Sequence, residues 1–100
     1  MDNAAKRLFA LLGRGRRAVT SHKAATVTAI RLFDLLPEHP MLTLPRAMAL
    51  LQTTKPTAGK AIDALCKAGV LHETTGKQRD RVYAYQAYLK VLAQDTAEID

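Results

Sequence analysis

The stretch from Pro56 to Val82 constrains the fold more than any other part of this chain. Its first half, residues 56–68, spaces apolar residues as an α-helix does, and Gly69 marks the end of that helix. Its second half, residues 70–82, predicts two short strands joined by a charged tip at residues 75–80. A helix that leads directly into a basic hairpin restricts the chain to mixed α and β architectures.

A second short helix is predicted just before this stretch. Residues 41–44 suit a short strand, Thr43 is an N-cap residue type, and a helix should run from Pro45 to Leu51. The turn is Gln52-Thr53-Thr54, and Thr54 should cap the next helix. Small residues occur where the two helices would cross: Ala47, Ala49, Ala58 and Gly59. Two short helices with a tight turn, followed by a basic hairpin, predict a winged helix-turn-helix, which is mainly α with a small β-hairpin.

The second helix of this motif is expected to have an inner and an outer face. The inner face should hold Ala58, Ile62, Leu65 and Cys66, at the spacing i, i+4, i+7 and i+8. The outer faces should hold Lys55, Thr57, Lys60, Ala61, Ala64 and Lys67. Because the second helix of such a motif enters the major groove of DNA, its outer polar residues are candidate DNA-binding residues.

The N-terminal part of the chain predicts two further helices. Residues 2–19 form the first, provided that the helix continues through its two glycines rather than breaking there. Three arginines in this helix are either phosphate ligands or a solvated face: Arg14, Arg16 and Arg17. Thr20 and Ser21 are N-cap types for the second helix, which should carry its apolar stripe from Ala25 to Leu36 and end at Pro37.

After the hairpin, a helix is predicted over residues 86–92, and residues 95–100 form an acidic tail. The tyrosines near the hairpin could stack on bases, although covering a small core is their commoner use: Tyr83, Tyr85 and Tyr88. The expected organisation is therefore an N-terminal helix at residues 1–20, which the family resemblance described below implies is a connecting helix, a winged helix-turn-helix domain at residues 21–94, and the tail.

The formal net charge of +6 favours a polyanionic partner, either nucleic acid or an acidic membrane. No stretch reaches the ~20 apolar residues that span a bilayer, and no signal peptide is recognisable. Double-stranded DNA is therefore the expected partner, with no membrane and a cytoplasmic location. Helices in the first half of the chain also offer apolar surface for a homodimer.

No catalytic or metal site is predicted. Cys66 is the only cysteine and falls at a core position, so a structural thiol is expected. The three histidines are scattered rather than set at metal-ligand spacing: His22, His39 and His72. No cofactor is expected, and the chain is not predicted to be an enzyme.

Eight residues are predicted to contact DNA. They are Lys55, Thr57, Lys60 and Lys67 on the helix, and Lys77, Gln78, Arg79 and Arg81 on the wing. The helix lacks the Arg, Asn and Gln that make bidentate base contacts, so phosphate contacts should dominate and sequence discrimination should be weak. Arg81 has an alternative role, since it could pair with Glu73 across the hairpin.

Several segments together resemble the C-terminal winged-helix domain of Fic family proteins. They are TKPTAGKAIDAL (54–65), AGVL (68–71), TGKQRDRVY (75–83), Tyr85 and YLKVL (88–92), and the likeness spans about residues 20–94. The Fic catalytic motif, a His-Pro-Phe start followed by a Gly-Asn-Gly-Arg loop, has no counterpart, because His39-Pro40 is followed by Met41. The resemblance therefore implies the accessory domain without the enzymatic activity. Gln52 stands where such turns often have Gly, so Gln52 would be strained if that position needs a positive φ.

Two functions follow from these patterns. The first is a DNA-binding winged helix, either a transcriptional regulator or the DNA-targeting accessory domain of a Fic-type protein. The second is an interaction module that positions a Fic catalytic domain or its protein substrate, which the resemblance implies. Binding through several Lys and Arg contacts weakens steeply with salt, so a salt titration with duplex DNA separates the two.

Overall fold

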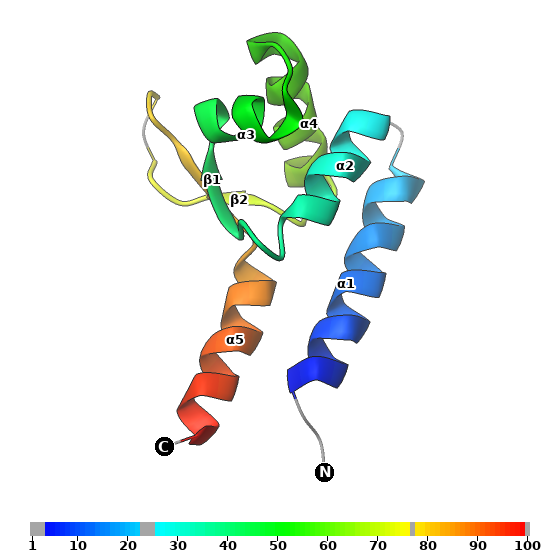
Figure 1. Cartoon of the computed structure of the whole chain (residues 1–100), viewed down its shortest axis with the longest axis vertical. Coiled ribbons are helices and arrows are strands. Elements are labelled where there is room, and N and C mark those ends of the chain that lie inside the picture. The colour runs from blue at the N-terminus through cyan, green and yellow to red at the C-terminus, as the bar shows by residue number, and fades with distance from the viewer. Residues whose placement is uncertain (1–3, 23–25, 77, 100) are drawn as a thin grey trace.

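The computed structural model describes residues 4–22, 26–76 and 78–99, and the side chains of residues 5–94 within these ranges. Its elements in chain order are α1 (Ala4–Ser21), α2 (Val27–Leu35), β1 (Met41–Thr43), α3 (Leu44–Leu51), α4 (Lys55–Lys67), β2 (His72–Glu73), β3 (Val82–Ala84) and α5 (Gln86–Ile99). In Figure 1, α3 and α4 lie at one end of the molecule and both chain termini lie at the other. The architecture is a winged-helix-like α+β fold, as predicted, with α1 and α5 added to it.

The helix-turn-helix is formed by α3 and α4. The Thr43 side chain caps α3 by accepting a hydrogen bond from the Arg46 amide, and Pro45 lies in the first turn. Gln52 then reverses the chain in the left-handed region, at φ 52° and ψ 52°, and its amide bonds back to α3. Thr54 precedes α4 as predicted, although its side chain makes no capping bond to the helix.

The predicted start of the second helix is wrong. Thr20 and Ser21 do not cap it but end α1, where their hydroxyls donate to the Arg17 carbonyl. Ser and Thr can bond backward to a helix carbonyl as readily as forward to an amide, and the sequence does not distinguish the two. Thr26 is the actual N-cap of α2 and accepts from the Ala29 amide at 3.0 Å. The predicted stripe residue Ala25 lies outside the described residues.

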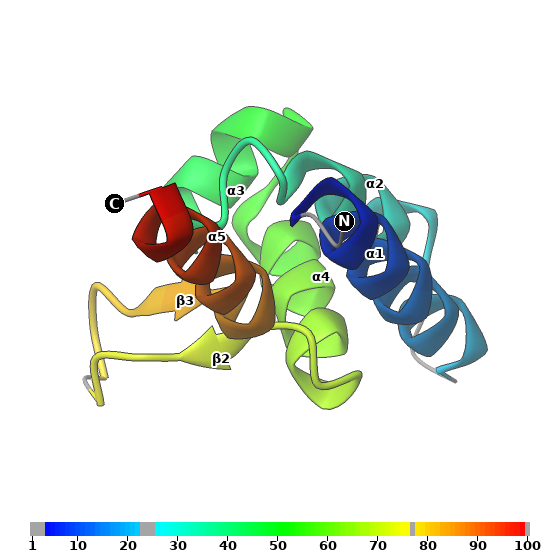
Figure 2. The same ribbon diagram turned by 90° about the horizontal axis from the view of Figure 1, so that it is seen from below.

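The three strands form an antiparallel sheet in the order β1-β3-β2. Leu42 pairs with Tyr83 and Thr43 with Val82, so the return strand of the hairpin lies between the outgoing strand and β1. Because β1 leads directly into α3, this pairing fixes the hairpin beside the start of the helix-turn-helix. The view from below shows the loop between β2 and β3 projecting beyond the helices (Figure 2).

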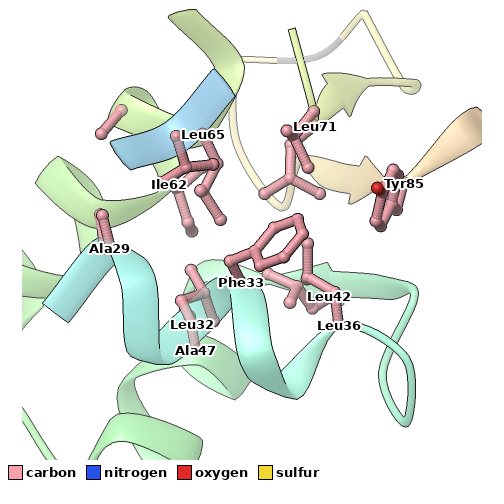
Figure 3. Close-up of a cluster of buried hydrophobic side chains, with 14 of the residues drawn as sticks. Ala29, Leu32, Phe33, Leu36, Leu42, Ala47, Ile62, Leu65, Leu71 and Tyr85 are labelled. Atoms are coloured by element: carbon pink, nitrogen blue, oxygen red, sulfur yellow. The ribbon is translucent and has the colours of Figure 1, made fainter. Parts of the chain in front are cut away.

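The core forms where α2 packs against α1, α3 and α4. Leu32 and Phe33 of α2, and Leu36 just after this helix, belong to the same buried cluster as Leu65 of α4 and Leu71 beyond it (Figure 3). The prediction that Ala61 and Ala64 lie on the outside of α4 is wrong, because both are buried. Since α2 and α3 both contact α4, the apolar arc of this helix is wider than one stripe, and alanines let the backbones approach closely.

Helix α5 continues to Ile99 and does not end at Leu92 as predicted. No glycine or proline follows Leu92, so the sequence holds no residue that would stop the helix there. The predicted acidic tail therefore has helical backbone as far as Ile99. At the start of α5, Tyr85 and Tyr88 are buried in the core, and the ring centroids of Tyr85 and Phe33 are 6.0 Å apart.

Replacing Gln52 with glycine is expected to stabilise the protein by about 0.5–1 kcal/mol, because a non-glycine residue at positive φ is strained. Denaturant unfolding followed by circular dichroism measures the change. Gly69→Ala is the reverse control: its φ is +81°, and a Cβ there would meet no atom within 4 Å, so backbone strain alone should destabilise it. A destabilised Gln52→Gly variant would contradict the strain at this turn.

Candidate nucleic-acid interface

A surface groove of about 710 Å³ lies between the helix-turn-helix and the hairpin. Four of the predicted DNA-binding residues line this groove: Lys55, Gln78, Arg79 and Arg81. The other lining residues are Thr43, Leu44, Pro45, Met48, Asp80 and Tyr83. Residues that lie far apart in the sequence therefore form one concave surface, which has three cations and an apolar side.

Two features of the fold bring these residues together. The β1–β3 pairing sets Val82 opposite Thr43, so the basic residues just before Val82 lie next to the first turn of α3. The left-handed turn at Gln52 then brings the chain back, so that Lys55 begins α4 at the same end of the groove. The cations therefore come from the start of one helix and from the wing, on either side of the α3 N-terminal turn.

The charges of the groove are not all of one sign. Lys55, Arg79 and Arg81 supply three cations, whereas the exposed Asp80 supplies one carboxylate between the two arginines. Asp80 has a φ of 54°, a left-handed conformation that Asp and Asn adopt more readily than most residues. This local turn sets the direction of the chain between Arg79 and Arg81.

The base of the wing is held by Glu73. Its carboxylate accepts hydrogen bonds from the Thr75 hydroxyl and amide and from the Gly76 amide, the last at 2.6 Å. The Thr75 hydroxyl bond is the main cause that lowers the pKa of Glu73, and the backbone amides and the positive charge of Arg81 add to it. Arg81 thus acts electrostatically on Glu73 while it lines the groove, and its pairing with Glu73 stays a prediction.

Three of the other predicted DNA-binding residues are described, and none of them lines the groove. Thr57 is half-buried and accepts a hydrogen bond from the Thr54 hydroxyl at 3.1 Å. Lys60 is exposed, but it lies about 140° around α4 from Lys55 at 100° per residue. Lys67 is in the last turn of α4, where it forms a 3.0 Å salt bridge with Asp63. Lys77 lies outside the described residues.

The apolar side of the groove was not found from the sequence. Leu44, Pro45 and Met48 come from the first turns of α3, and Tyr83 comes from β3. Tyr83 is the one tyrosine near the hairpin that is not buried in the core. The predicted strand at residues 41–44 could have indicated this apolar side. If that strand had been paired with the hairpin, the apolar residues at the start of α3 would have been placed beside the wing.

The arginines of α1 do not form a second basic site with the groove. Arg16 forms an ion pair with Asp34 of α2, and Arg14 lies close enough to act on the hydroxyl of Tyr85. None of the three arginines of that cluster lines the groove. Helix α1 continues unbroken past both of its glycines, as the sequence predicts.

Cys66 is a free, half-buried thiol packed against the core, and burial raises its pKa, with the nearby charges of Asp63 and Glu73 adding to the effect. Within residues 4–22, 26–76 and 78–99, no three residues among His, Cys, Asp and Glu gather closely enough to hold a metal ion. In the same ranges, no helix has the length and apolarity that crossing a bilayer requires.

Replacing Asp80 with asparagine is expected to raise duplex affinity by about 3- to 10-fold at low salt, because it removes a charge that repels phosphate. Asparagine also adopts the left-handed conformation, so the turn should be kept. Fluorescence anisotropy with a labelled duplex measures the effect. Asp63→Asn is the control, since it changes the net charge equally but lies on α4 outside the groove. An equal gain in both variants would show that net charge alone is responsible.

No family model matches the chain, and no curated protein sequence matches it either. The resemblance to the winged-helix domain of Fic proteins therefore stays a prediction from the residues that carry it.

Proposed function

We propose that this protein is a DNA-binding winged-helix domain that binds the duplex mainly through the phosphates of the DNA backbone. It would act as a transcriptional regulator or as the DNA-targeting part of a Fic-type protein. The observation that supports this proposal is the groove, in which Lys55 of α4 and the wing arginines Arg79 and Arg81 face one concave surface. A phosphodiester backbone is convex and anionic, which suits such a surface in both shape and charge.

The side chains available favour binding without strong sequence preference. Among the described residues that line the groove there is no asparagine, and Gln78 is the only one with an amide side chain. Lys and Arg contacts to phosphates position a protein on DNA but carry no sequence information directly. Tyr83, Met48 and Leu44 offer apolar surface that suits the sugars of one strand.

The test is a salt titration of duplex binding by fluorescence anisotropy. If each of the three groove cations neutralises one phosphate, the logarithm of affinity should fall with a slope of about −2.7 against the logarithm of salt, which is roughly a 40-fold loss between 50 and 200 mM. Two unrelated duplex sequences should give similar affinities. Absence of binding to either duplex at about 50 mM salt would refute the proposal, since electrostatic binding is strongest there.

The same titration addresses the second function predicted from the sequence. A module that only positions a Fic catalytic domain or its protein substrate needs no contact with phosphates. It should show no duplex binding that responds to salt in this way. Steep salt dependence therefore favours the DNA-binding function specifically.

A further inference from the structure

A second groove of about 400 Å³ lies on another part of the surface, between α1 and the end of α2. It is lined by Phe9, Leu12, Gly13 and Arg16 of α1, and by Phe33, Asp34 and Pro37 at the other side. No residue is shared with the basic groove. Its lining is largely apolar, whereas a phosphate-binding surface is cationic.

Phe9 is the most exposed large apolar side chain among those that the structure describes, with 76% of its surface open to solvent. It stands at the edge of the apolar groove and on the same helix face as Leu12, Gly13 and Arg16, which follow at i+3, i+4 and i+7. Gly13 has no side chain, so a partner can approach the backbone of α1 there. One surface thus carries both a protruding ring and a hollow that can receive one.

The rim of the apolar groove carries one charge of each sign. Arg16 and Asp34 form an ion pair across it, and about half of each side chain is exposed. A rim with both signs is complementary to itself: when two copies meet about a two-fold axis, the arginine of one can face the aspartate of the other. Self-complementarity is the property that an interface between identical subunits requires.

We propose that the apolar groove is the dimer interface of this protein, and that its occupant is a second copy of the chain. Phe9 of each copy enters the groove of the other, against Leu12, Phe33 and Pro37. Arg16 of each copy then bonds to Asp34 of the other, so that the two ion pairs join into a network of four charges. The interface is independent of the basic groove, which stays open on both copies.

Light scattering or sedimentation of the full chain over about 1–200 µM tests the proposal, because dimer formation depends on protein concentration. The parent chain should pass from monomer to dimer in this range. Phe9→Asp should remain monomeric, with dimer affinity at least about 100-fold weaker, because the central anchor of the interface is lost. Phe9 is exposed, so its replacement should leave the circular dichroism spectrum unchanged.

Val27→Asp is the matched control, because Val27 is equally exposed, at 75%, but lies at the start of α2 outside the apolar groove. It should dimerise like the parent. A monomeric parent at the highest concentration would overturn the proposal, and so would equal effects of Val27→Asp and Phe9→Asp. None of these outcomes depends on DNA, so failure here leaves the proposed function standing.

Exchanging the charges of Arg16 and Asp34 tests separately whether these two residues pair between subunits. Arg16→Asp and Asp34→Arg should each weaken self-association, since each leaves like charges facing one another. An equal mixture of the two variants should dimerise more tightly than either alone, because the exchanged pairs are restored between unlike copies. A mixture that associates no better than the separate variants would contradict the exchange of Arg16 and Asp34 between subunits.

Discussion

Replacing Arg79 and Arg81 together with alanine is expected to weaken binding to every duplex by about 10- to 100-fold near 0.1 M salt, since each exposed arginine–phosphate contact is worth about 1 kcal/mol. Both arginines line the basic groove from the wing, while Lys55 lines it from α4. The loss should be the same for unrelated sequences, because phosphate contacts do not read bases. The slope of log affinity against log salt should become shallower by about 2.

Fluorescence anisotropy titrations at several salt concentrations give both quantities. The control is Lys67→Ala with Lys90→Ala, which also removes two positive charges but leaves the groove intact. It should change affinity only slightly, through the lowered net charge. If the control and the wing variant lose affinity equally, the groove is not the binding surface, and the general positive charge of the protein accounts for binding.

The second prediction with a large effect concerns the free energy of unfolding of a glycine variant in α1. Gly15→Ala is expected to destabilise the protein by about 1–2 kcal/mol, although alanine normally stabilises a helix by about 1 kcal/mol relative to glycine. A Cβ at Gly15 would lie 2.7 Å from the Tyr85 hydroxyl and 2.9 Å from the nearest ring carbon of Phe33. Both rings are buried, so neither can move aside freely. The clash therefore outweighs the gain in helix propensity.

Gly13→Ala is the matched control on the same helix. Its Cβ would meet only the end of the Arg17 side chain at 3.6 Å, an ordinary contact, so it should stabilise by about 0.5–1 kcal/mol. Thermal unfolding at one low protein concentration should place the melting temperature of the two variants on opposite sides of the parent. Variants that shift in the same direction would contradict the close packing of α1 on Tyr85.

Tyr85→Phe adds a test of the same contact. The Tyr85 hydroxyl is buried and has no hydrogen-bond partner among the residues that the structure describes, so removing it should not destabilise the fold. Combined with Gly15→Ala, it should recover part of the lost stability, because the shortest contact disappears. The Phe33 contact would remain, so recovery should be incomplete.

Much of the fold could be predicted because its signals are local. Pro45 and Pro56 in first turns, the threonines before them and Gly69 after α4 mark helix ends directly. The sequence also pointed to Gln52 as the residue that would be strained if its turn required a positive φ, and the structure has φ 52° there. Where the signals compete, prediction fails: Thr20 and Ser21 suit a helix start, yet they end α1 by bonding backward.

The candidate interface could be predicted only in part, because it depends on tertiary pairing. Lys55, Gln78, Arg79 and Arg81 could be named from charge and position, but not the fact that they share one groove. That fact follows from the pairing of β1 with β3, which no local pattern specifies. Charge alone also predicted Lys67 as a DNA-binding residue. The fold places it at the opposite end of α4 from Lys55, in a salt bridge.

The central position of β3 has a thermodynamic consequence for binding. Because β3 pairs with β1 on one side and β2 on the other, the wing cannot rotate about its base without breaking both ladders. The wing and the helices are therefore preorganised as one unit before any partner arrives. The exposed cationic side chains of the groove, Lys55 included, must still be ordered on association, at about 0.5–1.5 kcal/mol for each one immobilised, but the strands and helices that carry them are already in place.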